Sequence, residues 1–151
     1  MQRYFLFFLL TVLFFSCSKG PGEGGTSVIE GRVLKYQISE SFFDTIIDGA
    51  VVSYPKIDTI IPLMPDEGVD VFIIYSSNEH DLYDDSFETD WKGRYRFEYL
   101  RKGDYTLYVV DDSTSIIDNS IVNYDYPVFR HVTISSNNST KTVDNFIIQK
   151  D

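Results

Sequence analysis

The residues best suited to chemistry form an acidic cluster, whose carboxylates are Asp81, Asp84, Asp85, Glu88 and Asp90. Calcium takes roughly six to eight oxygen ligands, and loops at strand ends can supply them, so the cluster is a candidate calcium site. The spacing lacks the glycine and the terminal glutamate of an EF-hand loop. The alternative interpretation is a solvated acidic loop that keeps the protein soluble.

The same carboxylates could also form the acid pair of a glycosidase, whose members stand about 5 to 9.5 Å apart. With 23 acidic residues in the chain, some pair meets that distance by chance. Neither His80 nor His131 lies in a recognisable nucleophile motif with a serine or a cysteine. We therefore expect no catalytic residue and no cofactor, and a small hydrolase is the alternative to a binding protein.

Four aromatic residues in expected loops or strand ends could form a ligand or partner surface, and they are Tyr83, Trp91, Tyr124 and Tyr126. Exposed aromatic rings stack on sugars and anchor protein partners. In a tyrosine-rich sandwich such rings also pack along the rim. Both interpretations stay open at this point.

Residues 1–16 predict a signal peptide, because Arg3 precedes an apolar run from Tyr4 to Phe15. The run is shorter than the ~20 apolar residues that cross a bilayer. The segment Phe14-Phe15-Ser16-Cys17 resembles a bacterial lipobox. That resemblance implies that Cys17 becomes the N-terminal residue and carries acyl chains, with an uncleaved helix as the alternative. We expect an outer-membrane lipoprotein of a Gram-negative bacterium, on either the periplasmic or the outer side.

Residues 17–26 are expected to hold the lipidated cysteine and a flexible tether. Five of the seven residues from Gly20 to Thr26 are glycine or proline, so neither helix nor strand is expected there. Residues 27–151 remain, and their number suits one domain.

Charge and cysteine content exclude several classes of protein. The formal net charge is −10, from 13 basic and 23 acidic residues, which argues against nucleic-acid binding through phosphates and against a polybasic lipid anchor. One cysteine excludes an internal disulfide, and two histidines leave little material for zinc. The expected partners are the membrane, through the lipid, and an envelope protein or a glycan.

The remainder of the chain has the composition of β-structure, with few good helix formers and many β-branched and aromatic residues. Residues 94–99 alternate strictly, which places Tyr95, Phe97 and Tyr99 on one face. Residues 104–109 alternate again, with Tyr105, Leu107 and Val109 facing inward. Other strands are expected over 28–37, 50–54, 69–76, 87–91, 128–135 and 142–149. Three long excursions, 40–49, 55–68 and 113–127, contain apolar residues that predict extra edge strands.

Residues 89–107 carry the pattern T-D-x-x-G-x-Y-x-F-x-x-L-x-x-G-x-Y-x-L. This pattern resembles the signature of carboxypeptidase-regulatory-like, or prealbumin-like, domains. Gly31-Arg32-Val33 and Gly49-Ala50-Val51-Val52 look like that family's opening strand and its G-A-x-V strand. The resemblance implies an all-β fold, a single seven-stranded or slightly extended Greek-key sandwich of the transthyretin type. The family spans many functions, so no activity follows from the fold.

Three triplets resemble the D-[ST]-[aliphatic or Thr] sites of O-glycosylation in some Gram-negative envelopes, and they would place sugars on Thr45, Thr59 and Ser113. Taken together, the sequence predicts a membrane-anchored, non-catalytic binding or scaffolding module for a protein partner or a glycan. The alternatives are a small envelope hydrolase that uses loop carboxylates and a calcium-stabilised adhesive module.

Overall fold

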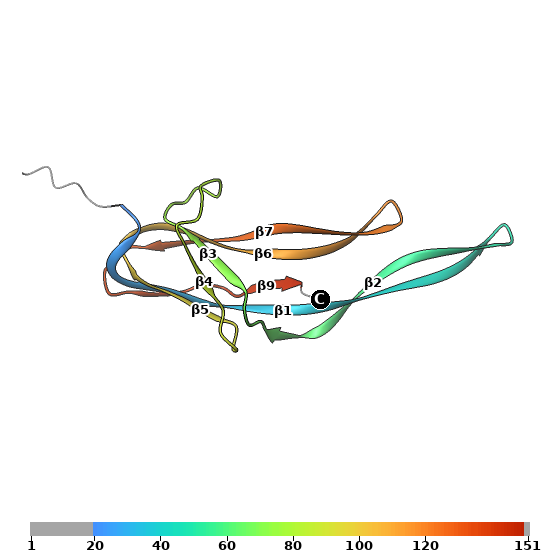
Figure 1. Cartoon of the computed structure of the whole chain (residues 1–151), viewed down its shortest axis with the longest axis horizontal. Coiled ribbons are helices and arrows are strands. Elements are labelled where there is room, and N and C mark those ends of the chain that lie inside the picture. The colour runs from blue at the N-terminus through green and yellow to red at the C-terminus, as the bar shows by residue number, and fades with distance from the viewer. Residues whose placement is uncertain (1–19, 150–151) are drawn as a thin grey trace, which may run out of the picture.

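The protein, seen in a computed structural model that describes residues 20–149, is an all-β sandwich (Figure 1). Its strands are β1 (Glu23–Ile47), β2 (Ala50–Pro65), β3 (Asp70–Ile74), β4 (Asp85–Glu88), β5 (Arg94–Leu100), β6 (Gly103–Ile117), β7 (Ser120–Ile134), β8 (Thr140–Thr142) and β9 (Phe146–Gln149). The expected sandwich is confirmed, in an extended form with nine strand segments in this part of the chain. Within the same range, no helix is long and apolar enough to cross a membrane.

Two sheets face each other. The first is organised around β1, which pairs antiparallel with β2 and β5 and parallel with the short strands β8 and β9. The second has the order β4-β3-β6-β7 and is antiparallel throughout. The strand expected over 69–76 is confirmed as β3, and it lies between β4 and β6.

The core lies between these sheets and is built from alternate residues of their strands. Its fully buried side chains include Ile29, Val33, Val71, Ile73, Tyr95, Tyr105, Leu107, Val109 and Phe146. Tyr95 and Phe97 face inward from β5, as the alternation predicted. Their rings lie 6.2 Å apart, and the Tyr95 ring lies 6.0 Å from that of Phe146. Burial of these large apolar surfaces is the main favourable term in folding.

Tyr99 was expected to face inward and does not. Its φ is +59°, a left-handed backbone conformation that residues other than glycine rarely adopt. This conformation ends the alternation of inward and outward side chains along β5. Leu100 is buried instead, and Tyr99 is 70% exposed.

The segment expected to be a tether is partly structured, because β1 begins at Glu23. Gly22 is held by the buried end of Tyr105, whose hydroxyl accepts a hydrogen bond from the Gly22 amide at 3.0 Å. The same hydroxyl donates to the Arg101 carbonyl at 2.8 Å, and the Arg101 amide donates to the Gly22 carbonyl at 2.9 Å. The expectation that no strand forms in 20–26 was therefore wrong for residues 23–26. Backbone hydrogen bonds to β5 outweigh the flexibility of the glycines there.

The closing strand expected over 142–149 is divided into β8 and β9. Both pair with β1, but the register changes by one residue, from Val28↔Thr140 to Val33↔Phe146. The segment that joins β8 to β9 thus has one residue more than the stretch of β1 opposite it, and the extra residue interrupts the hydrogen bonds between the strands, as a β-bulge does. The fourth expected strand is also shifted, to 85–88, because Asp90 begins the turn that leads to β5.

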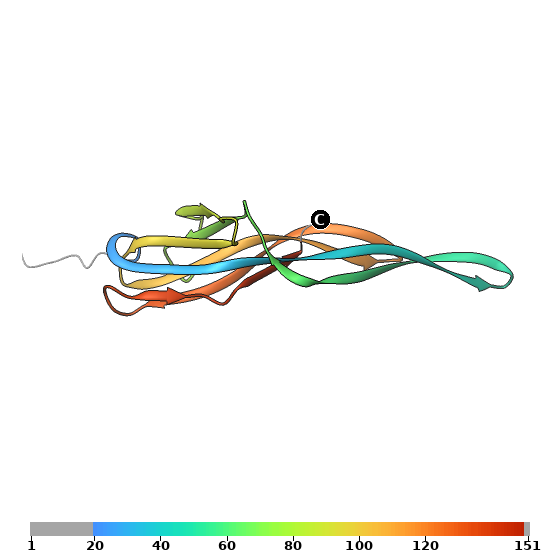
Figure 2. The ribbon, with the colours of Figure 1, turned by 90° about the horizontal axis from the view of Figure 1, so that it is seen from below.

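Two long hairpins leave the sandwich. Beyond Tyr36, β1 pairs with β2 alone, and beyond Tyr108, β6 pairs with β7 alone. We call the ribbon of residues 37–60 the first arm and the ribbon of residues 110–127 the second arm. Figures 1 and 2 show both arms extending from the end of the sandwich opposite the one where residue 20 lies. The excursions expected to pack down as edge strands form these arms instead.

The buried face of β6 should dominate stability. We expect Leu107→Ala to lower the free energy of unfolding by about 2–5 kcal/mol, because it removes contacts from a fully buried position and leaves a cavity. Denaturant titration followed by circular dichroism measures this change. Leu82→Ala, at a side chain that is 89% exposed, is the control and should shift stability by less than about 0.5 kcal/mol. Equal losses in the two variants would contradict the assignment of the core.

Candidate functional site

The carboxylates of the acidic cluster are held apart by local hydrogen bonds. Asp81 accepts from the Ser76 hydroxyl and the Asn78 side-chain amide, each at 2.6 Å. Asp84 accepts from the Tyr75 backbone amide at 2.6 Å, and Asp85 from the Ser86 amide at 2.8 Å. These contacts order the loop rather than direct the oxygens to one point.

The structure therefore gives the calcium interpretation no support. Glu88 lies on β4, paired in register with Asp70. Asp90 lies beyond the strand, in the turn before β5. Within residues 20–149, no group of three or more histidine, cysteine, aspartate or glutamate side chains is arranged to hold a metal ion.

Asp90 has a structural task. One of its carboxylate oxygens accepts the backbone amides of Lys92 and Arg94, both at 2.9 Å. The other oxygen receives the Arg94 guanidinium at 2.7 and 2.8 Å. The side-chain hydrogen bond from Arg94 is the largest cause that lowers the pKa of Asp90 to about 2. A glycosidase acid needs a raised pKa, so Asp90 is unsuited to proton donation near neutral pH.

The four candidate aromatic residues do not form one surface. The Tyr83 ring packs 4.8 Å from that of Phe72, over the outer face of the second sheet. Trp91 lies in the β4–β5 turn and is 67% exposed, with the Lys92 ammonium 4.4 Å from its ring. Tyr124 and Tyr126 lie on the second arm, with ring centroids 6.1 Å apart.

The three expected glycosylation positions lie in the arm strands rather than in loops. Thr45 pairs with Val52, Thr59 with Ile38, and Ser113 with Tyr124. Glycosylation at these residues stays a prediction.

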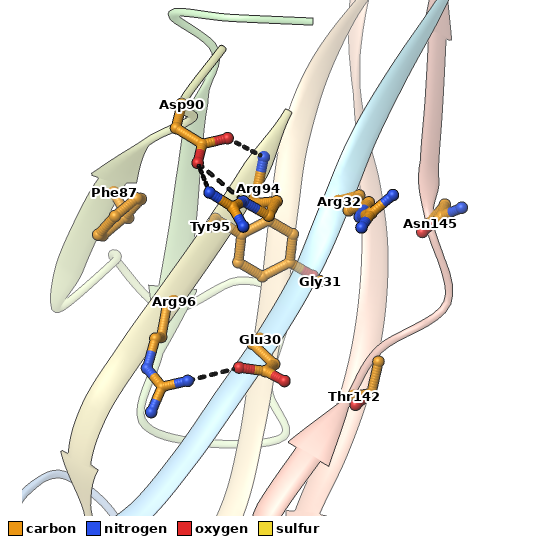
Figure 3. Close-up of a pocket in the computed structure, with 10 residues that line it drawn as sticks. All are labelled: Glu30, Gly31, Arg32, Phe87, Asp90, Arg94, Tyr95, Arg96, Thr142 and Asn145. Carbon is orange, nitrogen blue, oxygen red and sulfur yellow. Dashed lines mark hydrogen bonds and ion pairs between the residues drawn. The ribbon is translucent and has the colours of Figure 1, made fainter. Parts of the chain in front are cut away.

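A hollow of about 600 Å³ lies on the first sheet (Figure 3). Six of its ten lining residues belong to β1 and β5, namely Glu30, Gly31, Arg32, Arg94, Tyr95 and Arg96, and Phe87, Asp90, Thr142 and Asn145 complete it. We call it the arginine groove, after Arg32, Arg94 and Arg96.

The electrostatics of the arginine groove are unusual for an acidic protein. Arg32 of β1 stands directly opposite Arg94 of β5 in the register of the sheet. Arg94 is paired with Asp90, and Arg96 with Glu30 at 2.7 Å and Glu98 at 2.6 Å. Arg32 makes no ion pair with any residue in 20–149. Of the three arginines of the groove, Arg32 is therefore the one without a carboxylate partner among residues 20–149, and it favours an external anion.

A second, smaller hollow of about 300 Å³ extends the positive surface. Arg130, His131 and Lys141 contribute to it, and it shares Thr142 with the arginine groove. His131 Nε2 donates a hydrogen bond at 2.9 Å to the carboxylate of Glu79, which lies in the loop that follows β3.

Sequence reasoning missed the arginine groove. The sequence did contain one signal for it. Arg94 and Arg96 flank Tyr95, so the alternation that places Tyr95 in the core places both arginines on the outer face of the same strand. Arg32 gave no signal of its own, since its place opposite Arg94 depends on the pairing of two strands distant in sequence.

Known proteins of similar sequence do not place this chain in a family. No family model matches the sequence, and no curated protein matches it. A proposed carbohydrate-binding protein from Pseudomonas aeruginosa has a similar structure, with a TM-score of 0.45 and 14% identity over 85% of this chain and 91% of that one. A 9R-lipoxygenase from Cyanothece matches with a TM-score of 0.37 and 16% identity, over 80% of this chain and 16% of the enzyme. At these TM-scores neither likeness carries an argument about function.

The turn held by Asp90 should respond to acid. Its folded pKa lies near 2 against an ordinary value of 3.8, so its contribution to stability is complete above the ordinary value and is lost as the pH falls toward 2. A carbon-13 NMR titration of the Asp90 carboxyl should show a midpoint near pH 2. Asp90→Asn should remove this part of the acid dependence. A midpoint near 3.8 would contradict the hydrogen-bonded turn.

Proposed function

We propose that this protein is a membrane-anchored, non-catalytic binding module whose arginine groove holds an acidic glycan. The observation that carries the proposal is Arg32, which faces Arg94 across the sheet without an acidic partner among the described residues. A ligand carboxylate at the Arg32 guanidinium would supply the missing partner and could accept paired hydrogen bonds.

The other groups that line the groove support a sugar rather than a simple inorganic anion. Thr142 and Asn145 offer uncharged hydrogen-bonding groups, which suit sugar hydroxyls. Phe87 is 37% exposed and offers an aromatic edge or face for stacking. Among the residues that line the groove, Asp90 balances Arg94 and Glu30 balances Arg96, so the charge of Arg32 is left for one carboxylate of a ligand. A uronic acid within a glycan meets these requirements.

The acids of the groove support binding rather than hydrolysis. Glu30 and Asp90 are the carboxylates that line it, and each is in an ion pair with an arginine. A glycosidase requires one carboxyl group that stays protonated at working pH. The lowered pKa of Asp90 is the opposite condition.

We also propose that the domain belongs to the prealbumin-like group, on the strength of its signature glycines. Gly93 has a φ of +67°, and a Cβ at this position would lie 2.3 Å from the Val33 carbonyl oxygen. Gly103 closes the next hairpin, where a Cβ would meet the Pro21 ring at 2.4 Å. Both positions thus require the residue that the signature specifies.

The acidic-glycan proposal predicts a selective loss in one variant. Purified protein should bind oligogalacturonate, measured by isothermal titration calorimetry at low salt, and should not bind an uncharged galactose oligomer. Arg32→Gln should weaken binding roughly tenfold, because a hydrogen bond to a charged group contributes about 1.5–3 kcal/mol. Salt should weaken the wild-type interaction.

Lys102→Gln provides the matched control, since it removes one positive charge from an exposed position outside the groove. Equal effects of the two substitutions would indicate a general charge effect. Equal binding of charged and uncharged oligomers would exclude the proposed ligand class.

The anchor lies outside the described residues and has its own test. We expect the wild-type protein in the outer-membrane fraction, with a mass that includes acyl chains on Cys17. Cys17→Ser should abolish lipidation and processing at that position, because sulfur is the acyl acceptor. Mass spectrometry of the two purified proteins measures this difference. An unmodified Cys17 in protein from the native cells would contradict the lipoprotein assignment.

A further inference from the structure

The two arms end in nearly the same sequence. Residues 46–54 read IIDGAVVSY and residues 116–124 read IIDNSIVNY, with identical residues at five of nine positions. The two segments lie at the equivalent place, across the tip of each hairpin. Two hairpin tips that are far apart in the chain therefore have nearly the same sequence.

The tips also have the same backbone. Ile47 pairs with Ala50 across Asp48 and Gly49, whose φ values are +52° and +80°. Ile117 pairs with Ser120 across Asp118 and Asn119, whose φ values are +49° and +62°. Positive φ at both central residues defines the type I′ turn, for which Asp-Gly and asparagine are favoured.

Turn chemistry accounts for the central pairs but not for the apolar residues beside them. Ile47 is 47% exposed and Ile117 is 51% exposed, and each arm carries further exposed apolar side chains. These are Phe42, Phe43, Ile46 and Val51 on the first arm and Val110, Ile116, Val122, Tyr124 and Tyr126 on the second. An isolated two-stranded ribbon gains little stability in water, and exposed apolar strands promote association. Such tips are typical of surfaces that become covered.

The charges of the arms indicate what covers them. The first arm carries Glu40, Asp44, Asp48 and Asp58 against Lys56 alone, and Lys56 is already paired with Asp58 at 2.9 Å. The second arm carries Asp112, Asp118 and Asp125 at its surface, a buried Asp111 and no basic residue. Each tip turn contains an aspartate. Two copies of this chain would therefore repel each other at the arms, whereas a basic surface would be attracted.

We propose that the two arm tips together bind one partner protein that presents two equivalent apolar sites rimmed by lysine or arginine. Equivalent tips require equivalent receptor sites, so the partner is a symmetric dimer or contains an internal repeat. Binding through both tips gains from effective concentration, since the second contact is intramolecular once the first has formed. This surface is separate from the arginine groove, and the inference does not depend on the proposed glycan.

Photo-crosslinking tests the inference on the full-length protein in the cells that make it. A benzoylphenylalanine is placed at Ile47 in one variant, at Ile117 in a second, and at the exposed Tyr99 of the sandwich in a third. The same protein should be captured from both tips and not from Tyr99. The crosslinked peptides, identified by mass spectrometry, should carry net positive charge and map to equivalent sites in the partner.

The captured protein is then purified and its binding to the intact lipoprotein is measured by surface plasmon resonance. Asp48→Asn with Asp118→Asn keeps residues that the turn accepts but removes both tip charges, and it should slow association on the order of tenfold and reduce its salt dependence. Asp70→Asn with Asp85→Asn is the control, since both residues are exposed outside the arms. The inference would be overturned if the crosslinker captured the lipoprotein itself, captured a partner from one tip only, or gave no product from either tip. It would also be overturned if the captured peptides came from an acidic surface, or if the tip variant associated at the wild-type rate.

Discussion

The burial of alternate side chains from β5 and β6 between the two sheets is the constraint on which the rest of the structure depends. It fixes the strand register, and the register in turn fixes the outer surface. Because Tyr95 and Phe97 are committed to the core, Arg94 and Arg96 must face out, and because Val33 is buried, so must Arg32. A slip of one residue would invert every side chain of a strand. The arginine groove is therefore a consequence of the core, even though none of its charges is buried.

The signature region shows what local sequence can predict. The strands over 94–99 and 104–109 were expected and are confirmed, and so are the inward positions of Tyr95, Phe97, Tyr105, Leu107 and Val109. These features depend on alternation and turn chemistry within about twenty residues. The outward position of Tyr99 could not be predicted from local sequence. Its positive φ lies where β5 ends against the N-terminal segment that pairs with Leu100.

The arms and the groove could not be predicted in the same way. Residues 40–47 and 113–117 contain strand-forming residues, but nothing in their sequence tells whether they fold back on the sandwich or project from it. The glycines of Glu23–Thr26 predict a flexible segment when the local sequence is considered by itself. In the fold, pairing with a strand distant in sequence makes this segment part of β1. In each case the deciding contacts join residues that are distant in sequence.

One feature of β1 has a mechanical consequence. This strand is continuous from Glu23, next to the Gly22 amide that the Tyr105 hydroxyl binds, to Ile47 at the tip of the first arm. Along its path it is bonded to β5 and β8, then to β9 and β2. A pull between the two ends of β1 acts along the strand, so the lateral hydrogen bonds must shear together instead of opening one by one. The strand can therefore transmit a pulling force from the tip of the first arm to the opposite end of the molecule while the sandwich stays folded.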